Sequence, residues 1–125
     1  MLRLLLIVGS GGFIGSVARY LAHIYIHKYY PSSFPLATFT INIIGCLLIG
    51  IIYALSEKGN IMSADVRMFL AVGICGGFTT FSTFSYEILQ LLKAKEVIIA
   101  SAYIALSVFV GVLAAYLGAA IVKAI

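Results

Sequence analysis

The chain has 125 residues, of which 63% are hydrophobic and only 10% are charged, and its net charge is +4. Soluble domains carry about a quarter charged residues, so this composition excludes a soluble enzyme and a disordered regulator. The basic residues are scattered along the chain, which excludes a nucleic-acid-binding patch. We therefore expect an integral membrane protein made of a single transmembrane domain over residues 1–125.

The apolar residues form four stretches separated by short polar connections. A helix needs about 20 apolar residues to span a bilayer. The sequence therefore predicts an all-α membrane protein with four transmembrane helices. The apolar stretches are Leu4–His27, Leu36–Leu55, Met68–Tyr86 and Val97–Val122, and the third helix is predicted over residues 66–92.

The first stretch is rich in glycine and contains one charge. Gly11 and Gly15 have the small-xxx-small spacing that lets two membrane helices approach closely, so we expect a packing face there. Arg19 either snorkels to the interface or faces a wet vestibule that attracts anions. A cleavable signal peptide is the competing interpretation of this stretch. His23 and His27 have the spacing of metal ligands without a third ligand nearby, which favours interfacial histidines.

The second stretch places two polar side chains on one helical face. Thr38 and Asn42 are four residues apart. A buried asparagine in a membrane helix is costly unless it is partnered. It serves either as a hydrogen bond between helices or as part of an ion pathway.

The third stretch has a poor helix former at its centre, where Gly76 and Gly77 precede two β-branched threonines. We predict a break in the helix near residues 76–80. Unwound backbone within a membrane is tolerated only where it is buried in protein or lines a cavity. Its free carbonyls can hold a cation. The alternative is that these glycines serve close helix packing.

Hydroxyl side chains follow the predicted break and alternate with aromatic rings. Phe81 and Phe84 lie on one helical face, and aromatic ring edges are electropositive. Ring edges together with hydroxyl donors suit a small, strongly hydrated anion. The alternative is that these hydroxyls bond their own backbone. The five hydroxyl residues are Thr79, Thr80, Ser82, Thr83 and Ser85.

The fourth stretch offers Tyr103 and Ser107, again on one face. Cys46 and Cys75 are single and embedded, which is typical of small buried thiols. The sequence has no nucleophile–base set and no paired carboxylates, so we expect a protein that is not an enzyme.

The basic residues are nearly balanced between the two ends of the predicted bundle. The tails and the middle connection share one end, with Arg3, Lys58, Arg67 and Lys123. The positive-inside rule therefore gives no preferred orientation. Either a weak bias escapes this count, or copies insert both ways up and pair as an antiparallel dual-topology homodimer. The other end holds Lys28, Lys93 and Lys95, and also Arg19 if it snorkels that way.

Three motifs together resemble the Fluc (CrcB) family of fluoride channels: residues 76–85, residues 15–20 and residues 42–45. The resemblance implies an antiparallel dual-topology homodimer with two pores in the bacterial plasma (inner) membrane. It implies passive export of fluoride that enters the cell as the neutral acid. The implied partners are fluoride, sodium, the lipid bilayer and a second copy of the chain, with no nucleic acid.

The resemblance also implies roles for individual residues. A structural sodium ion at the dimer centre would be held by the carbonyls of Gly76 and Thr79. Phe81 and Phe84 would line the pore. Arg19 would mark a vestibule. The remaining implied pathway residues are Asn42, Thr38, Ser82, Thr83, Tyr103 and Ser107, with Glu87 at a pore end.

Two other functions fit four spans. One is a small dual-topology multidrug or guanidinium transporter, which needs an embedded acid, usually in the first helix. Neither the first nor the second apolar stretch contains an acid. The other is an assembly subunit that transports nothing, which the glycine-rich faces would favour.

Overall fold

The computed structural model describes Met1–Ile125 and contains only helices. Four of its helical segments are long and apolar enough to cross a membrane, which confirms the predicted all-α fold with four spans. The third segment is composite and runs from Ala64 to Lys93. The elements are α1 (Leu2–Tyr29), α2 (Leu36–Glu57), α3 (Ala64–Arg67), η1 (Met68–Cys75, π-helical), α4 (Gly76–Phe78), α5 (Phe81–Lys93) and α6 (Val97–Ala124).

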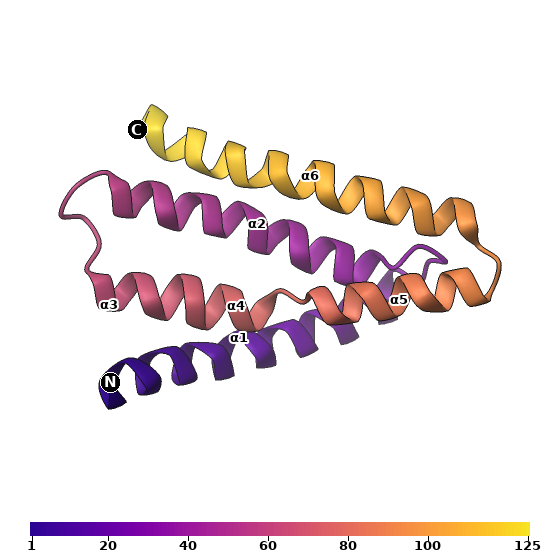
Figure 1. Cartoon of the computed structure of the whole chain (residues 1–125), viewed down its shortest axis with the longest axis horizontal. Coiled ribbons are helices and arrows are strands. Elements are labelled where there is room, and N and C mark those ends of the chain that lie inside the picture. Colours follow the sequence, from indigo (N-terminus) through magenta and orange to yellow (C-terminus); the bar gives the residue numbers. More distant parts are fainter.

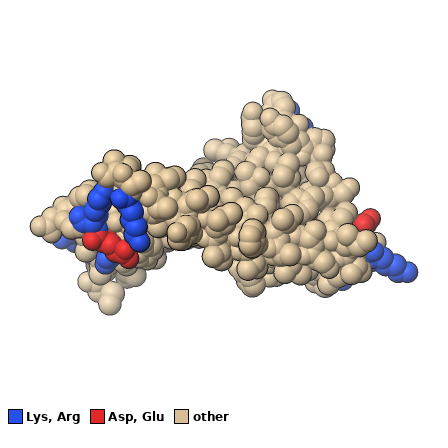
Figure 2. Space-filling view, turned by 90° about the horizontal axis from the view of Figure 1, so that it is seen from above, with Lys and Arg blue, Asp and Glu red and all other residues tan.

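The segments lie side by side as an antiparallel bundle (Figure 1). α6 runs along α2, and α1 runs along the η1–α4 part of the third segment. Both termini and the α2–α3 connection lie at one end, as four passes require. Lys, Arg, Asp and Glu side chains gather at the two ends of the molecule, with an uncharged surface between them (Figure 2). This distribution matches two polar interfaces around an apolar slab.

The third segment starts with a capped turn. The Ser63 hydroxyl accepts a hydrogen bond from the Val66 amide at 3.3 Å, and Asp65 lies in the first turn. Both features stabilise a helix N-terminus, because they satisfy a free amide and complement the helix dipole. The Asp65 carboxylate also pairs with the Arg3 guanidinium, which ties the start of α1 to the start of α3.

Glycines bring α1 into backbone contact with the third segment. A Cβ atom added to Gly15 would lie 2.2 Å from the Ile74 carbonyl oxygen, and one added to Gly11 would lie 2.6 Å from that of Phe69. No side chain fits at these distances, so only glycine permits this approach. The packing face predicted for Gly11 and Gly15 is confirmed.

The break in the third segment is present, but it does not fall on the glycine pair. Gly76 and Gly77 form the helical turn α4, and the backbone becomes extended at Thr79 and Thr80. Gly77 stays helical because it packs against α1: a Cβ atom there would lie 2.5 Å from the Gly12 carbonyl oxygen. Gly77 therefore serves helix packing, and the two threonines interrupt the helix.

The outer surface of the subunit is apolar. Only 18 of the 125 residues are buried within the subunit, and large apolar side chains from every long helix face outward. A surface of this kind has to be covered by lipid or by another protein chain. The fold alone thus matches a chain whose solvent is largely the bilayer.

The contact between α1 and the third segment can be tested with two matched substitutions. We expect Gly15→Ala to destabilise the protein by about 1–3 kcal/mol, because the new methyl group overlaps the Ile74 carbonyl. Gly9→Ala makes the same change on the same helix, where no atom lies within 4 Å, and should be neutral or slightly stabilising. Thermal unfolding in detergent, followed by circular dichroism, measures both. Equal effects would contradict close packing at Gly15.

Candidate functional site

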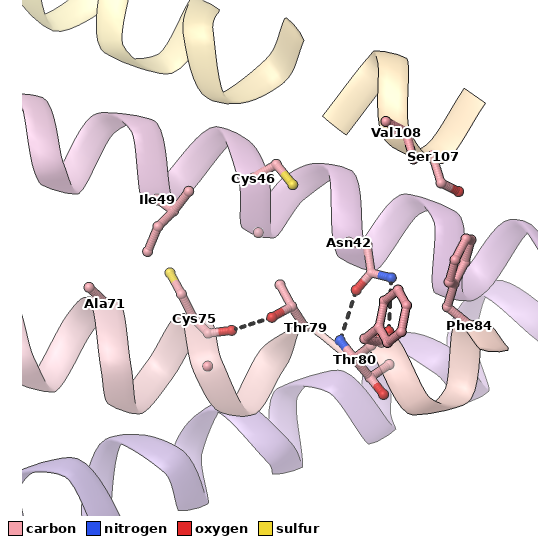
Figure 3. Close-up of a pocket in the computed structure, with 13 residues that line it drawn as sticks. Asn42, Cys46, Ile49, Ala71, Cys75, Thr79, Thr80, Phe84, Ser107 and Val108 are labelled. Carbon is pink, nitrogen blue, oxygen red and sulfur yellow. Dashed lines mark hydrogen bonds between the residues drawn. The ribbon is translucent and has the colours of Figure 1, made fainter. Parts of the chain in front are cut away.

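The break in the third segment is held by one side chain of α2. Asn42 Oδ1 accepts a hydrogen bond from the Thr80 amide at 2.9 Å, and Asn42 Nδ2 donates to the Thr80 carbonyl at 3.1 Å. Both backbone groups of Thr80 are therefore satisfied inside the protein (Figure 3). Asn42 acts as the hydrogen-bonding partner that an extended residue in a membrane requires.

The same arrangement removes the helical donors of two carbonyls. In a continuous α-helix, the Thr80 amide would bond the Gly76 carbonyl and the Thr83 amide would bond the Thr79 carbonyl. The Thr80 amide is instead bonded to Asn42, and the Thr83 amide to the Thr80 hydroxyl at 3.2 Å. The two carbonyls predicted to hold a cation are thus among those that lose their normal helical partners at the break.

Arg19 lies against this break. Its Nη1 donates a hydrogen bond to the Thr79 carbonyl oxygen at 3.2 Å, and its side chain is half-buried. Arg19 also lines a cavity of about 280 Å³ together with Thr80 and Thr83. Of the two predicted alternatives, this contact favours an arginine that faces a polar chamber.

A second cavity, of about 400 Å³, lies between α2, α6 and the third segment, and Thr80 lines both cavities. Asn42, Phe81, Phe84 and Ser107 line it together with apolar side chains (Figure 3). The Ser107 Oγ is buried and has no hydrogen-bond partner in the subunit. A buried hydroxyl without a partner is unusual and marks a donor available to a ligand.

Phe84 is positioned by a buried tyrosine. The rings of Phe84 and Tyr103 meet edge-on with centroids 4.8 Å apart, and Phe34 packs edge-on against Tyr103 at 5.2 Å. Tyr103 is fully buried, while Phe81 is 78% exposed and its ring centroid lies 5.6 Å from that of Phe84. One ring of the aromatic pair is therefore fixed inside the subunit, and the other projects from its surface.

Glu87 connects three elements by hydrogen bonds. Its carboxylate accepts one bond from the Thr38 hydroxyl and another from the Tyr103 hydroxyl, the latter at 3.2 Å. Because α5 continues to Lys93, Glu87 lies within the helix, beyond the end of the apolar stretch. It lines a third cavity of about 470 Å³, which opens near the α1–α2 connection.

Nearly all predicted pathway residues thus gather around the break. Ser82 also lies at the break, with its hydroxyl 3.4 Å from that of Thr80, but it is exposed, and neither Ser82 nor Tyr103 lines any of these cavities. The sequence interpretation counted Thr80 among the hydroxyl donors but did not predict that its side chain caps α5. Threonine is a favoured N-cap residue, so a helix restarting after the predicted break is the signal that could have identified this role. Both cysteines line the 400 Å³ cavity, and Cys75 is fully buried.

Comparison with known proteins identifies close relatives over nearly the whole chain. A relative from Flavobacterium psychrophilum is 49% identical over 116 residues, which cover 93% of this chain and 94% of the relative. A relative from Phocaeicola vulgatus is 47% identical over 117 residues, which cover 94% and 96%. A third, from Leptospira interrogans, is 43% identical over 119 residues, which cover 95% and 94%. Each of the three is named as a fluoride-specific ion channel, FluC.

The family model described as CrcB-like protein, Camphor Resistance (CrcB) matches residues 6–119, which cover the second and third long helical segments completely and most of the first and fourth. Four segments able to span a bilayer and this match together indicate a multi-pass membrane protein. The chain belongs to the CrcB family.

Proposed function

We propose that this protein is a fluoride-selective channel, which lets fluoride leave the bacterial cytoplasm passively across the plasma (inner) membrane. Its relatives are named as fluoride-specific ion channels and give no support to the alternative of a multidrug or guanidinium transporter. The observation that carries the proposal is the cavity where the unpartnered Ser107 hydroxyl and the rings of Phe81 and Phe84 meet.

The chemistry of this cavity suits fluoride. An unsolvated ion in an apolar medium costs tens of kcal/mol, so a pathway must replace the water that the anion loses. Hydroxyl and amide donors can do this for a small anion, and electropositive ring edges add to it. Ser107 and Asn42 supply such donors beside Phe81 and Phe84. A larger anion gains less from closely spaced donors, which favours fluoride over chloride.

We further propose that two copies pair in antiparallel orientation and complete the pathway. Phe81, one of the two pathway rings, is 78% exposed on the isolated subunit. A ring that lines an anion pathway needs protein on its exposed side, because lipid offers no donors to replace the water around the anion. The near balance of basic residues between the two ends supports copies of opposite orientation.

A structural sodium ion between the two copies completes this proposal. Each copy would offer the carbonyls of Gly76 and Thr79, whose helical amide donors are engaged elsewhere. Oxygen donors of this kind suit a hard cation. The hydrogen bond from Arg19 uses one of the two lone pairs of the Thr79 carbonyl and leaves the other for the ion. The ion would neutralise four inward carbonyl dipoles and hold the two breaks together.

Fluoride efflux from liposomes tests the channel function directly. Purified protein is reconstituted into liposomes loaded with potassium fluoride, and efflux is started with a potassium ionophore and followed with a fluoride electrode. We expect rapid loss of fluoride and none of chloride from matched potassium chloride liposomes. Absent fluoride efflux, or equal chloride efflux, would overturn the proposal.

Substitutions of the rings provide the control for this assay. Phe84→Ile should slow fluoride efflux about tenfold while the protein still assembles, because an aliphatic group offers no electropositive edge. Phe81→Ile should have the same effect. Phe13→Ile is the control matched to Phe81→Ile, since both rings are exposed but Phe13 lines none of the three cavities. Its efflux should equal that of the unaltered protein. Loss of assembly in Phe84→Ile would instead indicate a packing role.

The orientation of the copies can be read with single cysteines. In a Cys46→Ala, Cys75→Ala background, Ser33→Cys and Asn60→Cys place one exposed thiol at each end without changing a charge. With dual topology, a membrane-impermeant maleimide should label about half of the copies of each variant in intact cells. Full labelling of one variant and none of the other would show a single orientation.

The sodium proposal predicts a cation-specific stabilisation. Thermal unfolding of the purified protein should occur at a higher temperature in sodium chloride than in N-methylglucamine chloride of equal ionic strength, since a ligand bound only by the folded state stabilises it. Asn42→Leu, which frees the Thr80 amide, should abolish this difference. Equal unfolding temperatures for the unaltered protein in the two salts would exclude the sodium site.

A further inference from the structure

The two histidines continue a line of residues along one face of α1. Arg19, His23 and His27 are spaced by four residues, so their side chains lie one above the other from the middle of the bundle toward its end. The rings of His23 and His27 are neighbours, with centroids 5.3 Å apart. Arg19 begins the line at the break, where it bonds the Thr79 carbonyl. We call these three residues the basic line.

The basic line borders two cavities that share part of their walls. His23, Thr38 and Thr83 line both the 280 Å³ cavity at the break and the 470 Å³ cavity near the α1–α2 connection. The inner cavity holds Arg19, and the outer cavity holds His27. Because they share these lining residues, the two cavities adjoin and follow α1 from the end of the bundle toward the break, and we call the path along them the route.

The charges that face this route nearly cancel when the histidines are neutral. α1 contributes Arg19 and Tyr20, and α5 contributes Glu87 and Tyr86. α6 adds only the Tyr103 hydroxyl, bonded to Glu87, and the wall residues from α2 and the α1–α2 connection are uncharged. One arginine and one carboxylate give a formal charge of zero, and protonation of both histidines would raise it to +2.

We infer that the basic line is the route by which fluoride enters from this end of the subunit, and that protonation of His23 and His27 increases fluoride entry at acidic pH. This inference rests on the proposed channel function. Histidine is the side chain whose charge ordinarily changes between pH 5 and 8, so acidic pH is the condition that adds positive charge to this route. Positive charge along a confined route raises the local concentration of anions.

Fluoride efflux at two pH values tests the inference. At low fluoride concentration, we expect efflux through the unaltered protein to be roughly two- to tenfold faster at pH 5.5 than at pH 7.5, after subtraction of the leak from protein-free liposomes. The double variant His23→Gln, His27→Gln should lose the acceleration, so that its efflux rates at the two pH values are equal. Lys28→Gln is the matched control: it removes a positive charge next to His27 that lines neither cavity, and should leave the acceleration intact.

A fixed charge provides a second, independent variant. His23→Lys should give fast efflux at both pH values, and concentrated inert salt should reduce the acceleration of the unaltered protein, because exposed charges are screened. An acceleration that survives in the double glutamine variant, or an unaltered protein whose efflux does not change with pH, would overturn the inference. Absent fluoride efflux at both pH values would instead overturn the channel function itself.

Discussion

The structure depends on the hydrogen bonds between Asn42 and Thr80. An extended stretch inside a transmembrane segment leaves backbone groups that hydrocarbon cannot satisfy, at several kcal/mol each. Asn42 supplies one acceptor and one donor, which together match both backbone groups of Thr80. The break is stable because this side chain replaces the missing helical bonds. The free carbonyls at the break and the 400 Å³ cavity that Asn42 lines both depend on this interaction.

Glycine packing makes the break possible from the opposite side. Gly15 and Gly77 let α1 touch the third segment through backbone atoms, which brings Arg19 within hydrogen-bond distance of the Thr79 carbonyl. The basic line of Arg19, His23 and His27 lies on the same face of α1, farther along the helix. One helix face thus changes from small residues that pack to basic residues that border polar cavities. α1 therefore packs closely against the third segment at Gly11 and Gly15, and it borders cavities from Arg19 to His27.

The polar groups beyond the break are held by a network of fixed geometry. Tyr103 is buried, donates a hydrogen bond to Glu87 and packs edge-on against Phe84. The same tyrosine therefore positions both the Glu87 carboxylate and the Phe84 ring. Phe81 lacks such support within the subunit and projects outward. One chain thus encloses the part of the proposed pathway at Phe84, whereas the proposed partner would enclose the part at Phe81. The proposed selectivity rests on this rigid arrangement, because a donor track that could expand would accept chloride as well.

The sequence by itself determined the membrane fold, because four apolar stretches near the length of a bilayer leave no other way to bury them. It also identified Gly11 and Gly15 as a packing face, and the third segment as the one that is interrupted, since both features are local in the chain. The position of the break at Thr79–Thr80 required the tertiary structure: Gly77 was kept helical by Gly12 of α1, and the Thr80 amide was bonded by Asn42 of α2. Both effects come from contacts between helices that are far apart in the chain, and local helix propensity contains no information about such contacts.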